Sequence, residues 1–314
     1  MELRSLGDSG VRVSSVGLGC NNFGGAMWHA LDLGAARGVI EAALEVGINH
    51  FDTADVYGFG ASEEVLGEVL KDHRDNVVIA TKFGMMPRED GTPSGRPTVV
   101  RACLEASLAR LQTDYVDVFY YHIYDGVTPI EETLGAMDEL VAEGKARTIA
   151  CSNFTAEQLH EAHELASGAQ RFTAVQNQYS LLERDADDEV VPAVAELGLS
   201  FIPHSPLAGG LLTGKYRRGE EPPPGSRLSQ AFREMLSDRT FDSLDELTDY
   251  AEQRGHTLHE LAIAALVSTP TVASVIIGAM SVEQVRFNAH AASWKLDDNE
   301  LTALPRIVGG GMHW

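Results

Sequence analysis

The sequence predicts an α/β fold in which eight strand–helix units close into a (β/α)8 TIM barrel, preceded by a β-hairpin. After residue 15, short apolar segments alternate with longer segments whose apolar residues recur at helical spacing. The short segments are apolar throughout rather than alternating, which is typical of parallel strands covered on both faces. A length of 314 residues suits one such barrel, so we expect residues 1–314 to form a single domain.

The expected elements follow in order along the chain. Leu3–Leu6 and Val11–Val13 flank the turn-forming run Gly7-Asp8-Ser9-Gly10, which indicates the hairpin. The strands expected after it are Val16–Leu18, Ile48–Phe51, Val77–Ala80, Val116–Tyr121, Ala146–Ala150, Thr173–Gln176, Leu199–Pro203 and Val275–Ile277. The helices expected with them are Leu33–Glu45, Glu64–Leu70, Thr98–Leu111, Ile130–Val141, Glu157–Leu165, Asp188–Leu197, Leu244–Arg254, His259–Val267 and Val282–Ala292.

The main alternative is a doubly wound sheet that binds a dinucleotide. The glycine-rich run 17–25 does not give the G-x-G-x-x-G spacing that opens directly onto a helix in such sheets. A dinucleotide could therefore bind here only by other means, and the barrel is favoured.

The composition excludes several classes of partner. A formal net charge of −22 disfavours nucleic acid and anionic membranes, which reward positive charge. No run of 18 apolar residues and no basic-then-apolar leader occurs, so we expect neither membrane insertion nor secretion. Cys20, Cys103 and Cys151 are odd in number and widely spaced, as in a protein of the reducing cytoplasm. The 11 histidines show no ligand spacing, and no metal site is expected.

Four proton-handling side chains follow the ends of three successive expected strands: Asp52, Tyr57, Lys82 and His122. Strand ends of this kind meet at the barrel mouth, so we expect the four to converge. An ammonium ~4 Å from a phenol contributes roughly 4 kcal/mol at an effective dielectric constant of 20. Lys82 is therefore expected to lower the pKa of Tyr57 toward neutrality, while Asp52 keeps Lys82 charged.

These groups suit the reduction of a carbonyl. A neutral His122 can direct an N–H at the carbonyl oxygen while Tyr57 gives that oxygen a proton. No serine or cysteine nucleophile pairs with a base in the sequence, so hydride from a nicotinamide is the economical attacking group.

A set of ordered motifs resembles the aldo-keto reductase superfamily from the first hairpin to Asn288. The motifs are Asp52-Thr-Ala-Asp-Val-Tyr57-Gly, Ser62-Glu-Glu-Val-Leu-Gly67, Thr81-Lys82-Phe-Gly, His122, Gly144-Lys145 and Cys151-Ser152-Asn153-Phe154. The resemblance implies an enzyme that reduces aldehydes or ketones to alcohols. At the matching positions it makes Tyr57 the general acid, Lys82 and Asp52 its tuning pair, and His122 the residue that orients the carbonyl.

The resemblance also implies NADPH lying extended across the barrel mouth. Ser152, Asn153 and Gln176 would hold the nicotinamide carboxamide, and His204 stands where the family often stacks a tyrosine on the nicotinamide ring. The other cofactor residues are Leu207, Gly209 and Lys215 at the pyrophosphate, Gln284 and Asn288 at the adenine, and Gly19, Cys20, Asn21, Asp52, Ser205, Gly278 and Met280 elsewhere along the mouth.

The cofactor's 2′-phosphate lacks its usual partner. Many NADPH-using members carry lysine or arginine near positions 278 to 280, where this chain has glycine, alanine and methionine. Arg286 is the candidate substitute, and NAD(H) is the alternative cofactor. A second alternative is an NAD-dependent dehydrogenase of sugars or alcohols. A third is a nicotinamide-binding regulatory protein similar to the potassium-channel β subunits.

The segments around the mouth give further expectations. Aromatic and apolar side chains that could form a substrate wall are Trp28, Phe59, Phe83, Met85 and Tyr124. Residues 208–241 are expected to be one long loop, whose Lys215, Arg217, Arg218 and Arg227 indicate either an anion clamp or a solvated surface. The tail 309–314 suits either a flap over the pocket or a frayed terminus. His50 is expected to be a packed or half-exposed histidine rather than a catalyst.

Overall fold

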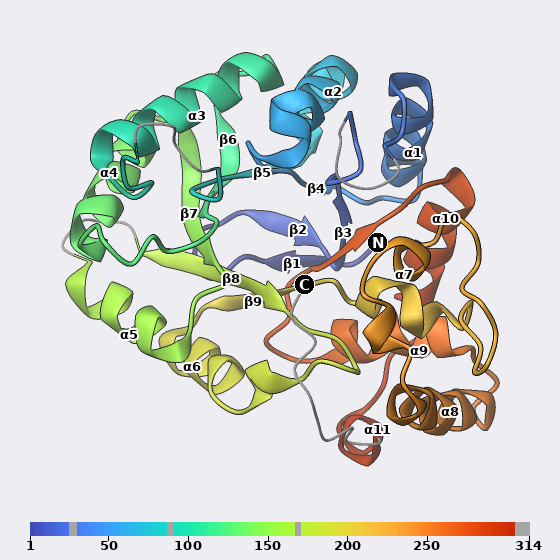
Figure 1. The fold of residues 1–314 in the computed structure, drawn as a ribbon. Helices are drawn as coiled ribbons and strands as arrows, with labels where there is room; N and C mark the ends of the chain where they lie inside the picture. The colour runs from blue at the N-terminus through green and yellow to red at the C-terminus, as the bar shows by residue number, and fades with distance from the viewer. Residues whose placement is uncertain (25–29, 87–90, 167–170, 305–314) are drawn as a thin grey trace.

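The computed structural model describes residues 1–24, 30–86, 91–166 and 171–304, and it confirms the (β/α)8 barrel with its hairpin (Figure 1). One sheet of parallel strands runs in the order β10-β3-β4-β5-β6-β7-β8-β9. It closes beside β10, where Phe201 N donates to Thr271 O (2.8 Å) and Ala273 N donates to Phe201 O (3.1 Å). The strands are β3 Val16–Gly19, β4 His50–Asp52, β5 Val78–Phe83, β6 Val116–Tyr121, β7 Ala146–Ser152, β8 Phe172–Gln178, β9 Ser200–His204 and β10 Val275–Gly278.

Helices surround these strands on the outside (Figure 1). Their starts have local causes: Thr155 and Thr257 each form a capping box, which satisfies backbone N–H groups in the first turn. The helices are α1 Leu33–Glu45, α2 Ala61–Leu70, α3 Pro97–Leu111, α4 Ile130–Ala142, α5 Ala156–Leu165, α6 Val190–Leu197, α7 Arg227–Gln230, α8 Asp238–Glu252, α9 Leu258–Ser268, α10 Val282–Ala291 and α11 Asp298–Ala303.

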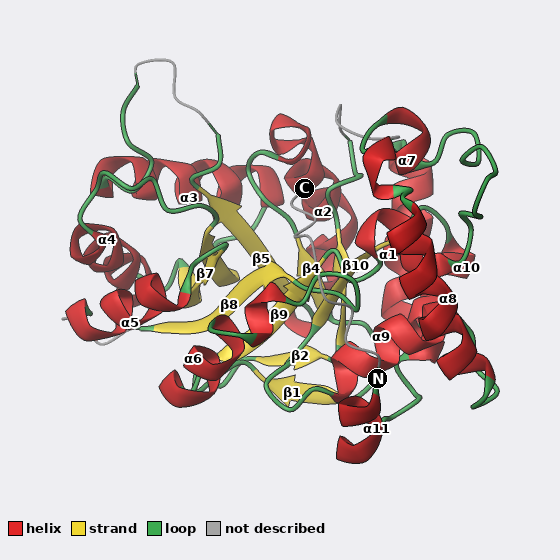
Figure 2. Cartoon of the chain, turned by 60° about the horizontal axis from the view of Figure 1, so that its bottom comes forward, coloured by secondary structure: helices red, strands yellow, loops and turns green. Residues whose placement is uncertain are grey.

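The hairpin closes one end of the barrel. Its strands, β1 Leu3–Ser5 and β2 Arg12–Ser14, pair in antiparallel fashion. The apolar residues Leu6, Val11 and Val13 are buried in one cluster with Ala273, which precedes β10, and with side chains that the strands turn inward, namely Val78, Ala80, Val118, Tyr120, Ala150, Ala174, Ile202 and Ile276. The hairpin lies at the end of the barrel opposite the C-terminal ends of the strands (Figure 2).

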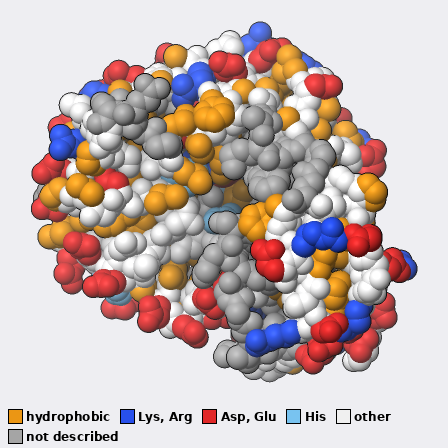
Figure 3. Space-filling view, viewed as in Figure 1, with side chains coloured by type: hydrophobic (Ala, Val, Ile, Leu, Met, Phe, Trp, Pro, Cys, Tyr) orange, Lys and Arg blue, Asp and Glu red, His pale blue; other side chains and the backbone are white. Residues whose placement is uncertain are grey.

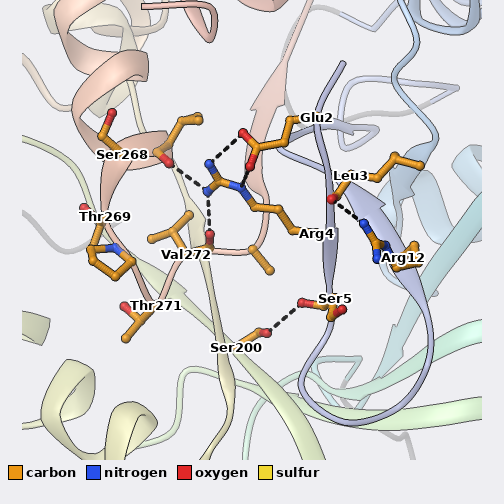
Figure 4. A pocket seen from close by; sticks show the side chains of 13 residues that line it. Glu2, Leu3, Arg4, Ser5, Arg12, Ser200, Ser268, Thr269, Thr271 and Val272 are labelled. Carbon is orange, nitrogen blue, oxygen red and sulfur yellow. Dashed lines mark hydrogen bonds and ion pairs between the residues drawn. The ribbon is translucent and has the colours of Figure 1, made fainter. Parts of the chain in front are cut away.

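A cleft of about 450 Å³ lies at this same closed end (Figure 4). Arg4 crosses it, and Nη1 donates to Val267 O (2.7 Å) and Val272 O (2.8 Å) while Nε and Nη2 donate to Glu2. The Arg4 guanidinium thereby fastens the hairpin to the connection between α9 and β10. The cleft is therefore far from Asp52 and Lys82, which lie at the other ends of their strands.

The pleat of β5 overturns the expected role of Phe83. Successive side chains of a strand point to opposite faces, so Lys82 lies in the barrel and Phe83 points out toward the helices. Phe83 is fully buried and stacks on Phe119 and Tyr121, each with ring centroids 4.9 Å apart. The prediction that Phe83 lines a substrate pocket is wrong.

Residues 208–241 are not the single loop that the sequence led us to expect. The segment contains a 3-10 turn at Ala208–Thr213 and α7, and α8 begins at Asp238, where Ser237 caps it by accepting from Thr240 N (3.2 Å). Arg218 is paired with three carboxylates of α8, those of Asp238, Asp242 and Asp245. Arg218 therefore ties the segment to α8, and this part of the anion-clamp prediction is wrong.

Candidate active site

A buried ion pair marks the open end of the barrel. Asp52 ends β4 and Lys82 lies near the end of β5, where the pleat turns both inward. Lys82 Nζ lies 2.5 Å from Asp52 Oδ1 and donates to Thr53 O (2.9 Å). The second carboxylate oxygen, Asp52 Oδ2, accepts from Gln176 Nε2 (2.8 Å). Such bonding is needed to hold two charges away from water.

Tyr57 and His122 complete the cluster. The Tyr57 hydroxyl and the Lys82 ammonium share a side-chain hydrogen bond, and Lys82 Nζ lies 5.2 Å from the centre of the Tyr57 ring. The rings of Tyr57 and His122 meet edge to face, with centroids 6.0 Å apart and planes at 84°. The structure thus brings together all four side chains that the sequence placed at three strand ends.

Burial sets the protonation states of the cluster. The pKa of Tyr57 is raised, because the loss of solvation outweighs the lowering effect of Lys82. We expected Lys82 to lower the pKa of Tyr57, and that expectation is wrong. The sequence does not show how deeply the Tyr57 hydroxyl is buried, and burial is the larger effect. Desolvation also disfavours a charged Lys82, but Asp52 and Tyr57 outweigh it and raise the Lys82 pKa. The pKa of His122 is well below its usual range, mainly through burial and then through Lys82.

The ends of β7 and β8 supply a polar wall beside this cluster. Ser152 Oγ donates to Gln176 O (2.7 Å) and accepts from Asn153 Nδ2 (3.1 Å). Asn153 has a φ of 59°, and its Nδ2 also donates to His122 O (3.1 Å). Asn153 Oδ1 lies 3.4 Å from His204 Nε2. Burial lowers the pKa of His204 to about 4, so its half-buried ring is neutral near pH 7.

The segment after β9 carries the cation Lys215 against a tight turn. His204 Nδ1 lies 3.2 Å from Ser205 Oγ, and Leu207 precedes a turn in which Gly209 has a φ of 65°. Lys215 Nζ lies against the turn, 5.1 Å from the Tyr216 ring centre. No carboxylate of the described residues lies within 4.0 Å of Lys215.

Gly278 leaves open space at the neighbouring side of the mouth, on β10. Gly19 of β3 and Gly278 of β10 are register partners. A Cβ added at Gly278 would find its nearest neighbours 3.8 Å away at Gly19 O and 3.9 Å away at Asn21 Oδ1. The thiol of Cys20 is buried with a raised pKa, and Cys20 lies near the mouth through its backbone. Thiol chemistry is thus disfavoured there.

The residues expected at the adenosine end lie on and before α10. Gln284 Oε1 accepts from Met280 N (2.8 Å), and Asn288 is buried with its side chain hydrogen-bonded to His259. Arg286 is paired with Glu45 (3.1 Å) on the surface. Sequence reasoning missed Asn22, whose Nδ2 donates to Ala279 O (2.8 Å); its position beside Asn21 was the available signal.

The expected substrate wall is only partly in place. Phe59 is 74% exposed, and Met85 is also exposed. Tyr124 is half-buried against Phe154, with ring centroids 5.8 Å apart. Figure 3 shows a hollow near the centre of this face, with a histidine in it and hydrophobic side chains around it. Trp28 and the tail 309–314 lie outside the described residues.

Sequence reasoning also missed a charged cluster behind Tyr57, formed by Asp55, Glu63 and Arg110. Glu63 is fully buried and accepts from Arg110 Nε (2.6 Å).

His50 is a packed histidine: it is fully buried and its Nδ1 lies 3.0 Å from Ser274 Oγ.

Within the described ranges, no group of three His, Cys, Asp or Glu side chains is arranged to hold a metal ion. None of the described helices combines the length and apolar character needed to cross a bilayer. No disulfide joins Cys20, Cys103 and Cys151.

Comparisons with known proteins agree on one family. The model of the Aldo/keto reductase family matches residues 15–308. A soybean (Glycine max) protein named probable aldo-keto reductase 1 is 35% identical, over 96% of this chain and 88% of its own. A rice (Oryza sativa subsp. japonica) protein named probable voltage-gated potassium channel subunit beta is 35% identical, over 93% and 91%. The L-glyceraldehyde 3-phosphate reductase of Escherichia coli K12 is 34% identical, over 99% and 93%.

Proposed function

Because this chain belongs to the aldo/keto reductase family, we propose that it is an oxidoreductase that reduces aldehydes or ketones with hydride from a nicotinamide cofactor. The observation that carries the assignment is the cluster of Tyr57, Lys82, Asp52 and His122 at the open end of the barrel. We expect the protein to act in the cytoplasm, in keeping with the absence of a disulfide.

Each of the four residues has a distinct role. Tyr57 holds its proton because its pKa is raised, and it gives that proton to the oxygen that gains negative charge. Lys82 stays charged next to the phenol and stabilises the anion left behind. Asp52 holds the ammonium in place, and neutral His122 supplies an N–H to orient the carbonyl.

The residues around the mouth fit a dinucleotide. Ser152, Asn153 and Gln176 form a polar wall beside His204, and Lys215 is available to a phosphate group. Gly278 leaves open space on β10, and we assign Gln284 and Asn288 of α10 to the adenine end of the cofactor. When bound, the cofactor supplies the hydride that attacks the carbonyl carbon. We propose NADPH as the cofactor, with NADH as the alternative.

Turnover of a tyrosine variant tests this function. The purified protein should consume NADPH in the presence of reactive aldehydes, a panel that includes glyceraldehyde 3-phosphate because a relative is named for it. Tyr57→Phe should lower kcat by about 10²-fold or more while cofactor binding persists. Tyr115→Phe is the matched control, because Tyr115 immediately precedes β6 and so lies at the end of that strand away from the mouth. An unchanged rate in Tyr57→Phe would overturn the assignment of the acid.

The rice relative favours one second candidate, a regulatory subunit that binds the cofactor and hardly turns over. Such a protein would bind NADPH tightly and leave every aldehyde of the panel unreduced. It should also co-purify with a channel protein, whereas the proposed reductase should need no partner for activity.

A further inference from the structure

The loop that carries Tyr57 has an unusual backbone. Gly58, Phe59 and Gly60 all have positive φ, at 58°, 54° and 96°. Phe59 is not a glycine, so its left-handed conformation is strained and persists only if its surroundings hold it. Gly60 gives α2 no side-chain cap, so the support must come from elsewhere.

Glu63 lies behind this loop in the first turn of α2. The side chain is fully buried and both oxygens are bonded. Oε1 accepts from Thr81 Oγ1 (2.5 Å), and Oε2 accepts from Arg110 Nε (2.6 Å). Thr81 immediately precedes Lys82 in β5. Glu63 is therefore bonded to the strand that carries the ammonium.

Arg110 links the same carboxylate to the loop. It extends from α3, and its side chain lies directly against Gly60. A Cβ at Gly60 would come within 2.6 Å of Arg110 Cδ and 2.7 Å of Nε, so any other residue there would displace the Arg110 side chain. The guanidinium thus packs against the turn that ends the Tyr57 loop, while it bonds Glu63.

Asp55 is the other acid in this cluster. It is buried, and its backbone N donates to Lys82 O (3.1 Å), so the loop is also fastened to β5 at its beginning. The charged groups that face Asp55 are Glu63, Arg110 and Lys82. Removal of Glu63 or Arg110 would disturb the far end of the loop, whereas the backbone bond of Asp55 would remain.

We propose that Glu63 and Arg110 are a positioning pair that sets the separation between the Tyr57 hydroxyl and the Lys82 ammonium. The pair touches neither reacting group. It acts through Thr81 on the strand and through Gly60 on the loop. This role rests on the proposed function, since the separation matters most when Tyr57 delivers a proton.

Three variants and a control test the pair. Glu63→Gln keeps the shape of the side chain and removes its charge. Arg110→Met removes the contact from the other side, and the double variant removes both without leaving a buried carboxylate unpaired. Glu64→Gln is the matched control, because Glu64 is exposed and adjacent in the same first turn.

The kinetic readout separates positioning from stability. All rates are measured well below each variant's melting temperature, with wild-type turnover as the reference. Glu63→Gln should lower kcat about 10- to 100-fold, with KM and the cofactor Kd within about threefold, since a 1 Å misplacement costs up to 10²-fold. The losses of the single variants should not multiply in the double variant. A folded Glu63→Gln with wild-type kcat, or fully multiplicative losses, would overturn the proposal.

A structural readout keeps the test independent of turnover. In crystals of Glu63→Gln, the distance between Tyr57 Oη and Lys82 Nζ should increase by about 1 Å or more, the displacement that would explain the loss of rate. The same distance should be unchanged in Glu64→Gln. If wild type shows no turnover, the proposed function fails and this distance alone decides the positioning role. An unchanged distance in Glu63→Gln rejects it.

Discussion

Lys82 Nζ lies 2.5 Å from Asp52 Oδ1, and neither side chain is open to solvent. Gln176 and Thr53 complete the bonding of the pair, so each charge is compensated within the protein. Buried pairs of this kind are costly to break from one side, because the remaining charge has no counterpart.

Lys82→Met should therefore destabilise the fold as well as abolish proton delivery. We expect the free energy of unfolding to fall by about 3–5 kcal/mol, because Asp52 stays buried with only the Gln176 amide as a partner. Adding Asp52→Asn to Lys82→Met should recover part of this loss. Urea unfolding of the two variants measures the difference. A double variant less stable than the single one would contradict the expectation.

The pH dependence of carbonyl reduction should be flat around neutrality. Tyr57 must hold its proton, and its raised pKa means that this requirement fails only at strongly alkaline pH. His122 must be neutral, and its lowered pKa keeps it so on the acid side. We expect kcat to stay constant between about pH 6 and pH 9. A steep change in that interval in steady-state assays would show that another group controls the reaction.

Asp55→Asn should stabilise the protein at alkaline pH and not at acid pH. Burial, with a contribution from Glu63, raises the pKa of Asp55 from 3.8 to about 7. The folded state binds this proton more tightly than the unfolded state, so stability is lost as pH rises from about 4 to 7. At pH 8 the loss is at most about 4 kcal/mol, and the asparagine variant avoids it.

Thermal unfolding of wild type and Asp55→Asn at pH 4 and pH 8 checks the direction in which the Asp55 carboxyl changes stability with pH. The melting temperature of the variant should exceed that of wild type only at the higher pH. The reverse order would mean that Asp55 gains a favourable charge interaction on folding.

Met280→Arg should increase the preference for NADPH over NADH. Met280 is 39% exposed just after β10, and Arg286 nearby is already paired with Glu45. An added guanidinium could bond a 2′-phosphate, and a charge-assisted contact of this kind is worth roughly 1.5–3 kcal/mol, or about tenfold or more in affinity. Fluorescence titration of wild type and variant with NADPH and with NADH measures the change in the ratio of the two dissociation constants.

Met85→Arg is the control for this experiment, because Met85 is similarly exposed but follows β5 on another part of the mouth. If both arginine variants change the cofactor preference equally, the effect is due to net charge and the adenosine end does not lie at β10.

Much of the fold and the convergence of the four site residues could be predicted from the sequence. The eight strands are short and apolar, and a parallel barrel places every strand end at one mouth, so Asp52, Lys82 and His122 had to meet. Their roles in catalysis stay predictions. Phe83 was misplaced because a run of buried residues at the end of a strand does not reveal which side of the pleat faces the pocket.

The features that the sequence did not predict depend on depth and on distant contacts. The direction of the Tyr57 pKa shift follows from how far solvent is excluded, which no local pattern encodes. Glu63 and Arg110 are separated by 47 positions and lie on different helices. Only the packing of α2 against α3 brings them together.

The apolar side chains of Leu6, Val11 and Val13 close the barrel at the hairpin end. Substrate and cofactor can then reach the site only from the open end of the barrel. The first residues of this chain lie near the closed end (Figure 2). The protein could thus be tethered to a bead or an electrode through residue 1, with its working surface turned toward the solution.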